Sequence, residues 1–337
     1  YGDMGRHGHP FLKTPNMDAL GGQSVRFTDF CVSSSCSPTR AALMSGMFNL
    51  RAGVTHTMHP REHMSQRLTI LPQHLKQAGY TTCCVGKWHI GEDKGYAPHE
   101  RGFDFWLARH HEFYTNGKYR EDIMFDEAMR FMGECGDKPF FCYLATLSPH
   151  TPLTVPDKYV EPYKDKATDE QAHFFGMIAN LDENVGRILR WLEEKKLADN
   201  TIIMFISDNG ASSEGGPNGS VNENKFFNSW PDDLAENLTM IDKLGGPDCY
   251  NHFPTGWAGA WSTPFKMFKR YSEYAGGTWA IFGPGQVELA RPLAAPHGRL
   301  FFCGEHTAIS ARGMEAAFES AERVSLEVLD ALSTKMR

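Results

Sequence analysis

The fold is decided by an apolar run, Phe140-Phe141-Cys142-Tyr143-Leu144-Ala145-Thr146-Leu147, which is followed at once by Ser148-Pro149-His150. A nearly continuous apolar run of this length predicts a β-strand buried on both faces, as in parallel sheets. Residues 201–206 repeat the pattern, and residues 81–85 form a shorter β-rich run. The sequence therefore predicts at least three buried strands.

Stretches with helical spacing separate these strands. Apolar residues recur three or four positions apart from Phe174 to Leu192, and similar spacing predicts helices over residues 122–135 and 71–78. A further short strand is predicted near residues 25–31. The alternation of helix and strand predicts an α/β fold with a mostly parallel central sheet flanked by helices.

Polar residues follow the predicted strands directly. Lys87 and His89 follow the strand predicted at residues 81–85, and His150 follows the one that begins at Phe140. Asp208 and Asn209 follow the one at residues 201–206. Taken singly, each has an ordinary interpretation as a solvated lysine, a hydrogen-bonded core histidine or a turn. Because open α/β sheets bind ligands beyond the carboxyl ends of their strands, the shared placement favours a functional site.

A second polar stretch, Cys36-Ser37-Pro38-Thr39-Arg40, leads into helix formers that continue to Gly46. Pro38 suits the first turn of a helix, so we expect Cys36 at a helix N-terminus. Backbone N–H groups and the helix dipole favour negative charge there. The alternative for Cys36 is a buried structural thiol.

Composition narrows the classes of function. The chain has 337 residues, of which 41% are hydrophobic and 22% charged, and its net charge is -7. This predicts a globular protein and argues against a nucleic-acid partner. No run of about 18 apolar residues predicts a transmembrane segment. The eight cysteines show no disulfide or zinc-site spacing.

Six motifs together resemble sulfatases of the alkaline-phosphatase superfamily over residues 1–272. They are Gly2-Asp3-Met4-Gly5, Thr14-Pro15-Asn16-Met17-Asp18, Cys36-Ser37-Pro38-Thr39-Arg40, Gly86-Lys87-Trp88-His89, Pro149-His150-Thr151-Pro152 and Ser207-Asp208-Asn209-Gly210. The resemblance implies hydrolysis of sulfate esters. It also implies that a formylglycine-generating enzyme converts Cys36 to formylglycine, whose hydrated form attacks the sulfur.

The same resemblance assigns roles to individual residues. The catalytic set would be Cys36, Arg40, Lys87, His89, His150 and Lys269. Within it, Lys87, His150 and Lys269 would bind the sulfate, with Lys266 as a close competitor for Lys269. The substrate would be a small-molecule or sugar sulfate ester. The sequence does not indicate a compartment, although the resemblance is compatible with a periplasmic or secreted protein.

The resemblance also implies a divalent metal, with calcium expected because hard oxygen ligands suit it. Its ligands in this chain would be Cys36, Asp208 and Asn209. The family's two further aspartates would precede Tyr1, so we expect a metal site and a fold that are incomplete at the N-terminal edge.

Residues 273–337 resemble instead the C-terminal segment of flavin-dependent amine oxidases. Gly304, Glu305 and Met314 are the positions that would match flavin contacts. A dinucleotide-binding Gly-x-Gly-x-x-Gly after a strand is absent from the sequence, so FAD binding is not expected. We therefore expect a sulfatase-like domain over residues 1–272 that is incomplete at its C-terminal end as well, and a short α+β tail over 273–337.

Sulfate ester hydrolysis is thus the leading prediction, and three alternatives stay open. One is a catalytically inactive, truncated or fused sulfatase. The second is a phosphoester hydrolase of the same superfamily, which the Cys-x-Pro-x-Arg run disfavours. The third is a fragment of a flavin amine oxidase, which the missing dinucleotide motif disfavours.

Overall fold

The structure is a computed structural model that describes residues 2–25, 32–108, 112–244 and 248–271. All of these belong to one of the two units into which the chain divides. The other unit, Phe27–Cys31 and Ala280–Arg337, lies outside the described residues, as does the predicted tail. Of the strand predicted near residues 25–31, only Val25 is described.

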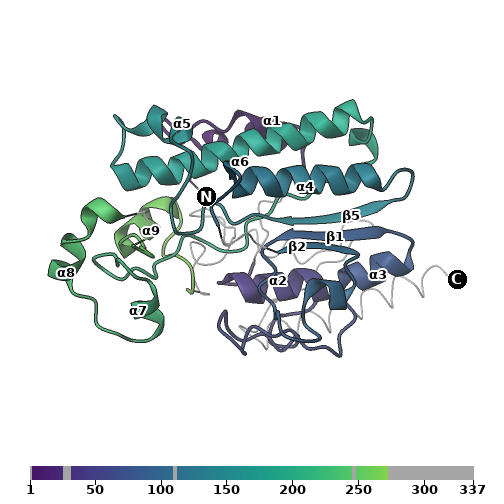
Figure 1. Ribbon diagram of the computed structural model, residues 1–337, viewed down its shortest axis with the longest axis horizontal. Helices are drawn as coiled ribbons and strands as arrows, with labels where there is room; N and C mark the ends of the chain where they lie inside the picture. Colours follow the sequence, from purple (N-terminus) through teal and green to yellow (C-terminus); the bar gives the residue numbers. More distant parts are fainter. Residues whose placement is uncertain (1, 26–31, 109–111, 245–247, 272–337) are drawn as a thin grey trace, which may run out of the picture. The chain divides into compact units, whose positions relative to one another are not determined.

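A three-stranded parallel sheet lies at the centre of the described unit (Figure 1). Its order is β2 (Phe105–Ala108), β1 (Thr81–Gly86) and β5 (Phe140–Ala145), with Cys84 opposite both Trp106 and Tyr143. A small antiparallel hairpin, β3 (Tyr114–Thr115) and β4 (Lys118–Tyr119), precedes α4. The prediction of an α/β fold with a parallel sheet is confirmed.

Helices cover both faces of this sheet, as Figure 1 shows. Alternate residues of β1 point to opposite faces. Cys83 and Val85 pack under α4 (Arg120–Glu134), whereas Cys84 packs toward α2 (Cys36–Ser45). The helix α3 (Leu71–Gln77) lies on the same side as α2. Because β1 is the middle strand of the sheet and helices cover both faces, it is buried along almost its whole length.

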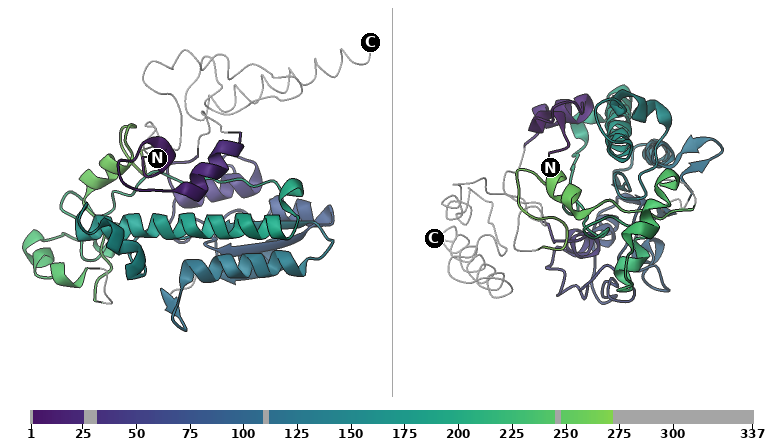
Figure 2. Two further views of the ribbon diagram at one scale, coloured as in Figure 1. Left: turned by 90° about the horizontal axis from the view of Figure 1, so that it is seen from above. Right: turned by 90° about the vertical axis from the view of Figure 1, so that its left-hand side faces the viewer.

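The longest helix among the described residues, α6 (Asp169–Glu194), packs on both α4 and α1 (Pro15–Gln23) (Figure 2). It begins with a capping box, in which Thr168 accepts a hydrogen bond from the backbone N–H of Gln171. Asp182 in its middle accepts from Asn16 Nδ2 and the Met17 backbone N–H, both at 2.8 Å. A buried carboxylate therefore satisfies the first turn of α1.

Two strand predictions need correction. The run from Phe140 ends as a strand at Ala145, and most of β5 is half-buried because it is an edge of the described sheet. Residues 201–206 form no strand, and the side chains of Ile202 and Met204 are 85% and 77% exposed. A strand needs a neighbour to complete its hydrogen bonds, and no described strand pairs with this segment.

Glycine shapes the end of β1. Gly86 has φ +99°, and a Cβ at this position would lie 2.2 Å from the carbonyl oxygen of Ala145. Only glycine accepts both the backbone angle and the contact. The chain then continues with the Lys87 N–H donating to that same carbonyl at 2.8 Å, which ties the exits of β1 and β5 together.

Residues 211–271 form an insertion beyond the carboxyl ends of the strands, drawn in green in Figure 1. Its described residues include three short helices, α7 (Asn224–Phe227), α8 (Leu234–Leu238) and α9 (Thr255–Trp261). Trp261 stacks on Phe174 of α6, with ring centroids 4.0 Å apart. The insertion is thus anchored to the core. No helix in the described part of the chain is long and apolar enough to cross a membrane.

The remaining elements are short. Within the part of the chain that the structure describes, they are α5 (Asp157–Val160) and five 3₁₀ turns, at Gly5–His7, Pro98–Arg101, Glu161–Tyr163, Ala198–Asn200 and Ile241–Lys243.

Candidate active site

Cys36 is the first residue of α2, as the sequence predicts, and its side chain is buried. Its Sγ lies 3.3 Å from Nδ1 of His89. The other ring nitrogen of His89, Nε2, lies 3.0 Å from the carbonyl oxygen of Thr57. Because a carbonyl only accepts, Nε2 carries the proton and Nδ1 presents its lone pair to residue 36. His89 can therefore take a proton from a group at that position.

Arg40 lies one helical turn after Cys36 and joins three segments. Its Nε and Nη2 donate to Oδ2 of Asp208 at 2.9 and 2.6 Å. Its Nη1 donates to the Tyr143 hydroxyl at 3.2 Å and to the carbonyl oxygen of Lys87. This buried guanidinium fixes the start of α2 relative to the ends of β1 and β5.

Asp208, which pairs with Arg40, and Asn209, the next residue, both have side-chain oxygen atoms. Burial alone would raise the pKa of Asp208, but the charges of Arg40 and Lys87 outweigh it and hold that pKa at about 2. Asn209 Oδ1 is buried and has no hydrogen-bond partner among the described residues. An ionised carboxylate beside an unsatisfied amide oxygen fits a hard divalent cation.

Lys87 and His150 lie together in the interior of the site. Burial, followed by the nearby Arg40, lowers the pKa of Lys87, although the charges of Cys36 and Asp208 oppose this. Burial and the charges of Lys87 and Lys269 lower the pKa of His150 well below its usual range, so its ring is neutral at pH 7. His150 Nδ1 lies 2.7 Å from the Thr151 carbonyl oxygen and must donate to it.

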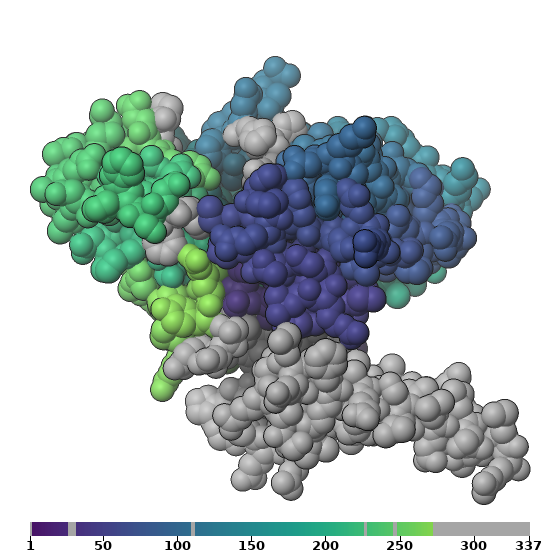
Figure 3. All heavy atoms as spheres, turned by 90° about the horizontal axis from the view of Figure 1, so that it is seen from below, coloured from purple at the N-terminus to yellow at the C-terminus, as the bar shows by residue number. Residues whose placement is uncertain are grey.

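The insertion brings a second lysine to the same place. Lys269 is buried, and its Nζ pairs with Oε2 of Glu214 at 2.9 Å. The next residue, Arg270, donates its backbone N–H to the Ser34 carbonyl oxygen at 2.8 Å, just before α2. In Figure 3 this light-green segment lies against purple and blue atoms of the N-terminal third. Lys266, the competing candidate, is exposed.

Behind Lys269 is a buried cluster that the sequence analysis missed: Glu214, Glu223 and His252, whose potential ligand atoms all lie within 4.8 Å of one another. Glu223 accepts from Thr151 Oγ1 at 3.2 Å, and His252 Nε2 lies 2.9 Å from Ser212 Oγ. Lone charged residues in a Gly-rich insertion leave no periodic signal.

The charges within this cluster differ sharply. Burial would raise the pKa of Glu214, but Lys269 and the Ser212 hydroxyl bring it to about 2. Burial and the Glu214 charge raise the pKa of Glu223 to about 7. Burial lowers the pKa of His252 to about 4. Glu214 therefore serves as the counter-ion of Lys269, while His252 stays neutral at pH 7.

The structure thus brings most of the predicted residues into one site. Contacts link Cys36 to His89 and Arg40 to Asp208 and the Lys87 backbone, and electrostatic interactions link Lys87, His150 and Lys269. Asn209 follows Asp208, with its side-chain NH₂ donating to the Gly210 carbonyl oxygen. Buried cations around a residue at a helix N-terminus can bind an oxyanion and stabilise added negative charge.

Comparison with known families gives the site its context. Residues 1–252 match the family model described as sulfatase. The chain belongs to the sulfatase family. Residues 266–329 match a second model, flavin containing amine oxidoreductase, and most of this stretch lies outside the described residues. Both resemblances predicted from the motifs are confirmed.

Individual relatives agree with the sulfatase match. Human N-acetylgalactosamine-6-sulfatase is 30% identical over 65% of this chain and 50% of its own length, so the chain spans half of that relative. An arylsulfatase of Klebsiella aerogenes is 23% identical over 81% of this chain and 76% of its own length. The crystal structure of the sulfatase PsFucS1 from Pseudoalteromonas sp. shares the fold with a TM-score of 0.52, at 24% identity over 64% of this chain and 54% of that one.

Proposed function

We propose that this chain hydrolyses sulfate esters with residue 36 as the nucleophile, after Cys36 is converted to formylglycine by a formylglycine-generating enzyme. The observation that carries the proposal is the position of Cys36. It begins α2, faces the lone pair of His89 Nδ1, and feels the charges of Lys87 and Lys269. One hydroxyl group of hydrated formylglycine attacks the sulfur, the S–O bond to the alcohol breaks, and the alcohol leaves. The remaining hydroxyl group then loses its proton as the C–O bond to the sulfate breaks, which releases sulfate and regenerates the aldehyde.

In this proposal His89 is the general base. Its Nδ1 lies 3.3 Å from the side chain at position 36, close to hydrogen-bond reach. The bond from Nε2 to Thr57 O holds both the ring and the tautomer, so the lone pair stays directed at the nucleophile. Arg40 acts through position, because it anchors the first turn of α2 to Asp208.

Lys87, His150 and Lys269 would bind the sulfate group. A sulfate ester is anionic, and bond cleavage moves more charge onto its oxygens, so two ammonium groups stabilise the transition state. The neutral ring of His150 lies near both lysines and contributes a polar contact without further positive charge. Burial strengthens these interactions because little water screens them.

Asp208 and Asn209, with residue 36, would hold a divalent cation, for which calcium is the proposed choice. The cation would supply further stabilisation of negative charge on the sulfate. The unsatisfied Oδ1 of Asn209 and the ionised carboxylate of Asp208 support this assignment. Asp208→Ala should reduce calcium affinity at least tenfold in equilibrium dialysis, since it removes a charged ligand. An unchanged affinity would contradict the assignment.

A sugar sulfate is the substrate class we propose. The support is similarity to human N-acetylgalactosamine-6-sulfatase at 30% identity. The insertion supplies the segments beyond the strand ends that would contact the sugar, since loops at that edge commonly shape substrate sites.

Mass spectrometry of residue 36 is the decisive test. The chain is co-expressed with a formylglycine-generating enzyme, and the peptide that contains Cys36 should lose about 18 Da when a thiol becomes an aldehyde. Turnover of aryl sulfates and hexosamine 6-sulfates is then compared with that of Cys36→Ala, which should have none. Cys249→Ala, at another buried cysteine, is the control. Turnover that survives Cys36→Ala would overturn the proposal.

A further inference from the structure

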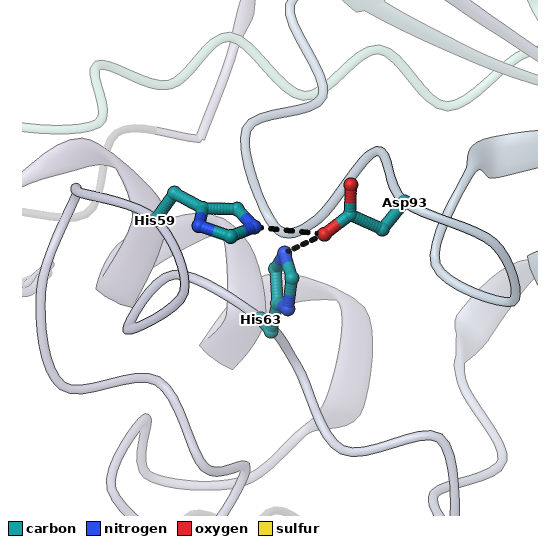
Figure 4. Close-up of side chains that lie close together, drawn as sticks. All are labelled: His59, His63 and Asp93. Atoms are coloured by element: carbon teal, nitrogen blue, oxygen red, sulfur yellow. Dashed lines mark hydrogen bonds and ion pairs between the residues drawn. The ribbon is translucent and has the colours of Figure 1, made fainter.

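Three side chains that the proposed reaction does not use converge at one point in Figure 4. His59 and His63 come from the loop after α2, and Asp93 comes from the loop after β1. His59 Nε2 lies 2.8 Å from Asp93 Oδ2, and His63 Nε2 lies 3.2 Å from the same oxygen. The potential ligand atoms of all three lie within 4.8 Å of one another.

A hydrogen bond between His59 Nε2 and Asp93 Oδ2 accounts for the position of His59, but not for that of His63. The Nε2 atom of His63 is buried and lies near Asp93 Oδ2, and 3.4 Å from Glu62 Oε1. It nevertheless has no hydrogen-bond partner among the described residues, and neither does the buried Oε2 of Glu62. Buried polar atoms left without partners cost free energy. A cation between them would satisfy the nitrogen lone pair and the carboxylates together.

The surrounding loops hold this geometry in place. The His63 ring stacks on Tyr96, with centroids 4.3 Å apart, and meets the His59 ring edge-on at 4.8 Å. The backbone N–H of Tyr96 donates to the Asp93 carbonyl oxygen at 2.9 Å. Next to His63, the Met64 N–H donates to the Ile90 carbonyl oxygen at 3.2 Å, which joins the two loops. Much of the cost of ordering a site is therefore already met by packing.

We propose that His59, His63 and Asp93 bind a divalent transition-metal ion, with Zn²⁺ as the expected occupant. Two imidazole nitrogens and one carboxylate oxygen are ligands that zinc accepts in tetrahedral sites, with a fourth position for water or for Glu62. Imidazole nitrogen is a poor match for calcium or magnesium, which take oxygen ligands. The site is separate in chemistry and in residues from the oxygen pair at Asp208 and Asn209.

Zinc at this position would connect two loops that contribute to the active site. The first loop contains Thr57, whose carbonyl oxygen accepts from His89, and the second follows His89 directly. An ion held by His59 and Asp93 would close these loops on each other and restrain His89 between them. The expected consequence is a higher melting temperature with zinc bound, because the ion binds only the folded arrangement.

The test uses the full chain, stripped with a chelator and titrated with ZnCl₂ by isothermal titration calorimetry, with bound metal counted by mass spectrometry. The variants are His59→Asn and Asp93→Asn, whose side chains are 67% and 59% exposed, so the fold should tolerate them. His74→Asn, an exposed histidine on α3, is the matched control. All are made in a Cys36→Ala background to remove the thiol as a competing ligand.

We expect one zinc ion per chain in the background protein and the His74 control. Each ligand variant should bind at least about tenfold more weakly, the scale at which even outer-shell changes act. Co²⁺ in place of zinc should give visible absorption bands that the ligand variants lose. Equal zinc affinity in His59→Asn, Asp93→Asn and the control would overturn the proposal, as would binding of calcium in preference to zinc.

Discussion

Two sides of the proposed active site each contain an ion pair, but they differ in net charge. The sheet side consists of Arg40, Lys87 and Asp208 and has two cations around one carboxylate. The insertion side consists of Lys269, Glu214 and Glu223 and has one cation beside two carboxyl groups. Each side contains one close ion pair, at 2.6 and 2.9 Å. The comparison teaches that surplus positive charge gathers on the sheet side, whereas the insertion side approaches neutrality by keeping a proton on Glu223.

The largest expected effect is on activity, which should fall more for a substitution on the sheet side than for one on the insertion side. Lys87→Met removes a net charge and should lower kcat/KM by about 10³-fold, the upper range for one transition-state donor. The double variant Lys269→Met with Glu214→Gln removes a cation and its counter-ion together, so the loss should be at least tenfold smaller. Lys266→Met, on an exposed side chain, is the control and should change nothing. An equal loss in the first two variants would break the comparison.

Stability should reveal what the sheet-side pair does for the fold. Arg40→Ala leaves Asp208 without its main partner in a largely buried place, and breaking such a pair costs about 3 to 5 kcal/mol. Arg130, on the surface of α4, pairs with Glu127 and Glu134, and Arg130→Ala should cost less than about 1 kcal/mol. Urea unfolding at pH 7 measures both. Similar losses would mean that Arg40 does not anchor α2.

A smaller effect on the insertion side depends on pH. The folded chain keeps a proton on Glu223 that the unfolded chain releases, because its pKa is raised from 4.5 to about 7. Glu223 therefore costs no stability below about pH 4.5, and its cost grows as the pH rises to about 7. Glu223→Gln should raise the free energy of unfolding by up to roughly 3 kcal/mol at pH 8 and leave it unchanged near pH 4.

Glu214, in the same cluster, changes the stability of the fold with pH in the opposite direction. Its pKa is lowered from 4.5 to about 2, so it contributes stability above pH 4.5 that is lost as the pH falls toward 2. The exposed Glu193 on α6 provides a control, Glu193→Gln, whose stability profile should follow the parent chain. A Glu223→Gln difference that is constant across the pH range would show that the carboxyl group does not titrate in that window.

Much of the scaffold could be predicted from the sequence because periodic patterns record it. Helical spacing located α4 and α6, and a β-rich run located β1, since each buries a continuous face. Residues 201–206 have the same apolar character, yet form no strand. A local pattern shows that a segment is apolar. It does not show whether a neighbouring strand is present to pair with that segment, which a strand also requires.

The residues of the candidate site also divide into those that the sequence could predict and those that it could not. Cys36, Lys87, His89 and Asp208 could be placed together because each follows a predicted strand or begins a predicted helix, and such ends are expected at one edge of a parallel sheet. Glu214 and Glu223 could not, because their role depends on Lys269 and Thr151, contacts made far along the chain. Whether a carboxyl group in a loop is solvated or buried beside a lysine is decided by tertiary packing alone.

Gly86 has a consequence for how this sequence can vary. The carbonyl oxygen of Ala145 occupies the space where a side chain would begin, so the position is closed to every residue that carries a Cβ. A library that diversifies the active site can vary the residues on either side, but variants at 86 should be purged at the folding step, before any selection for new substrates can act on them.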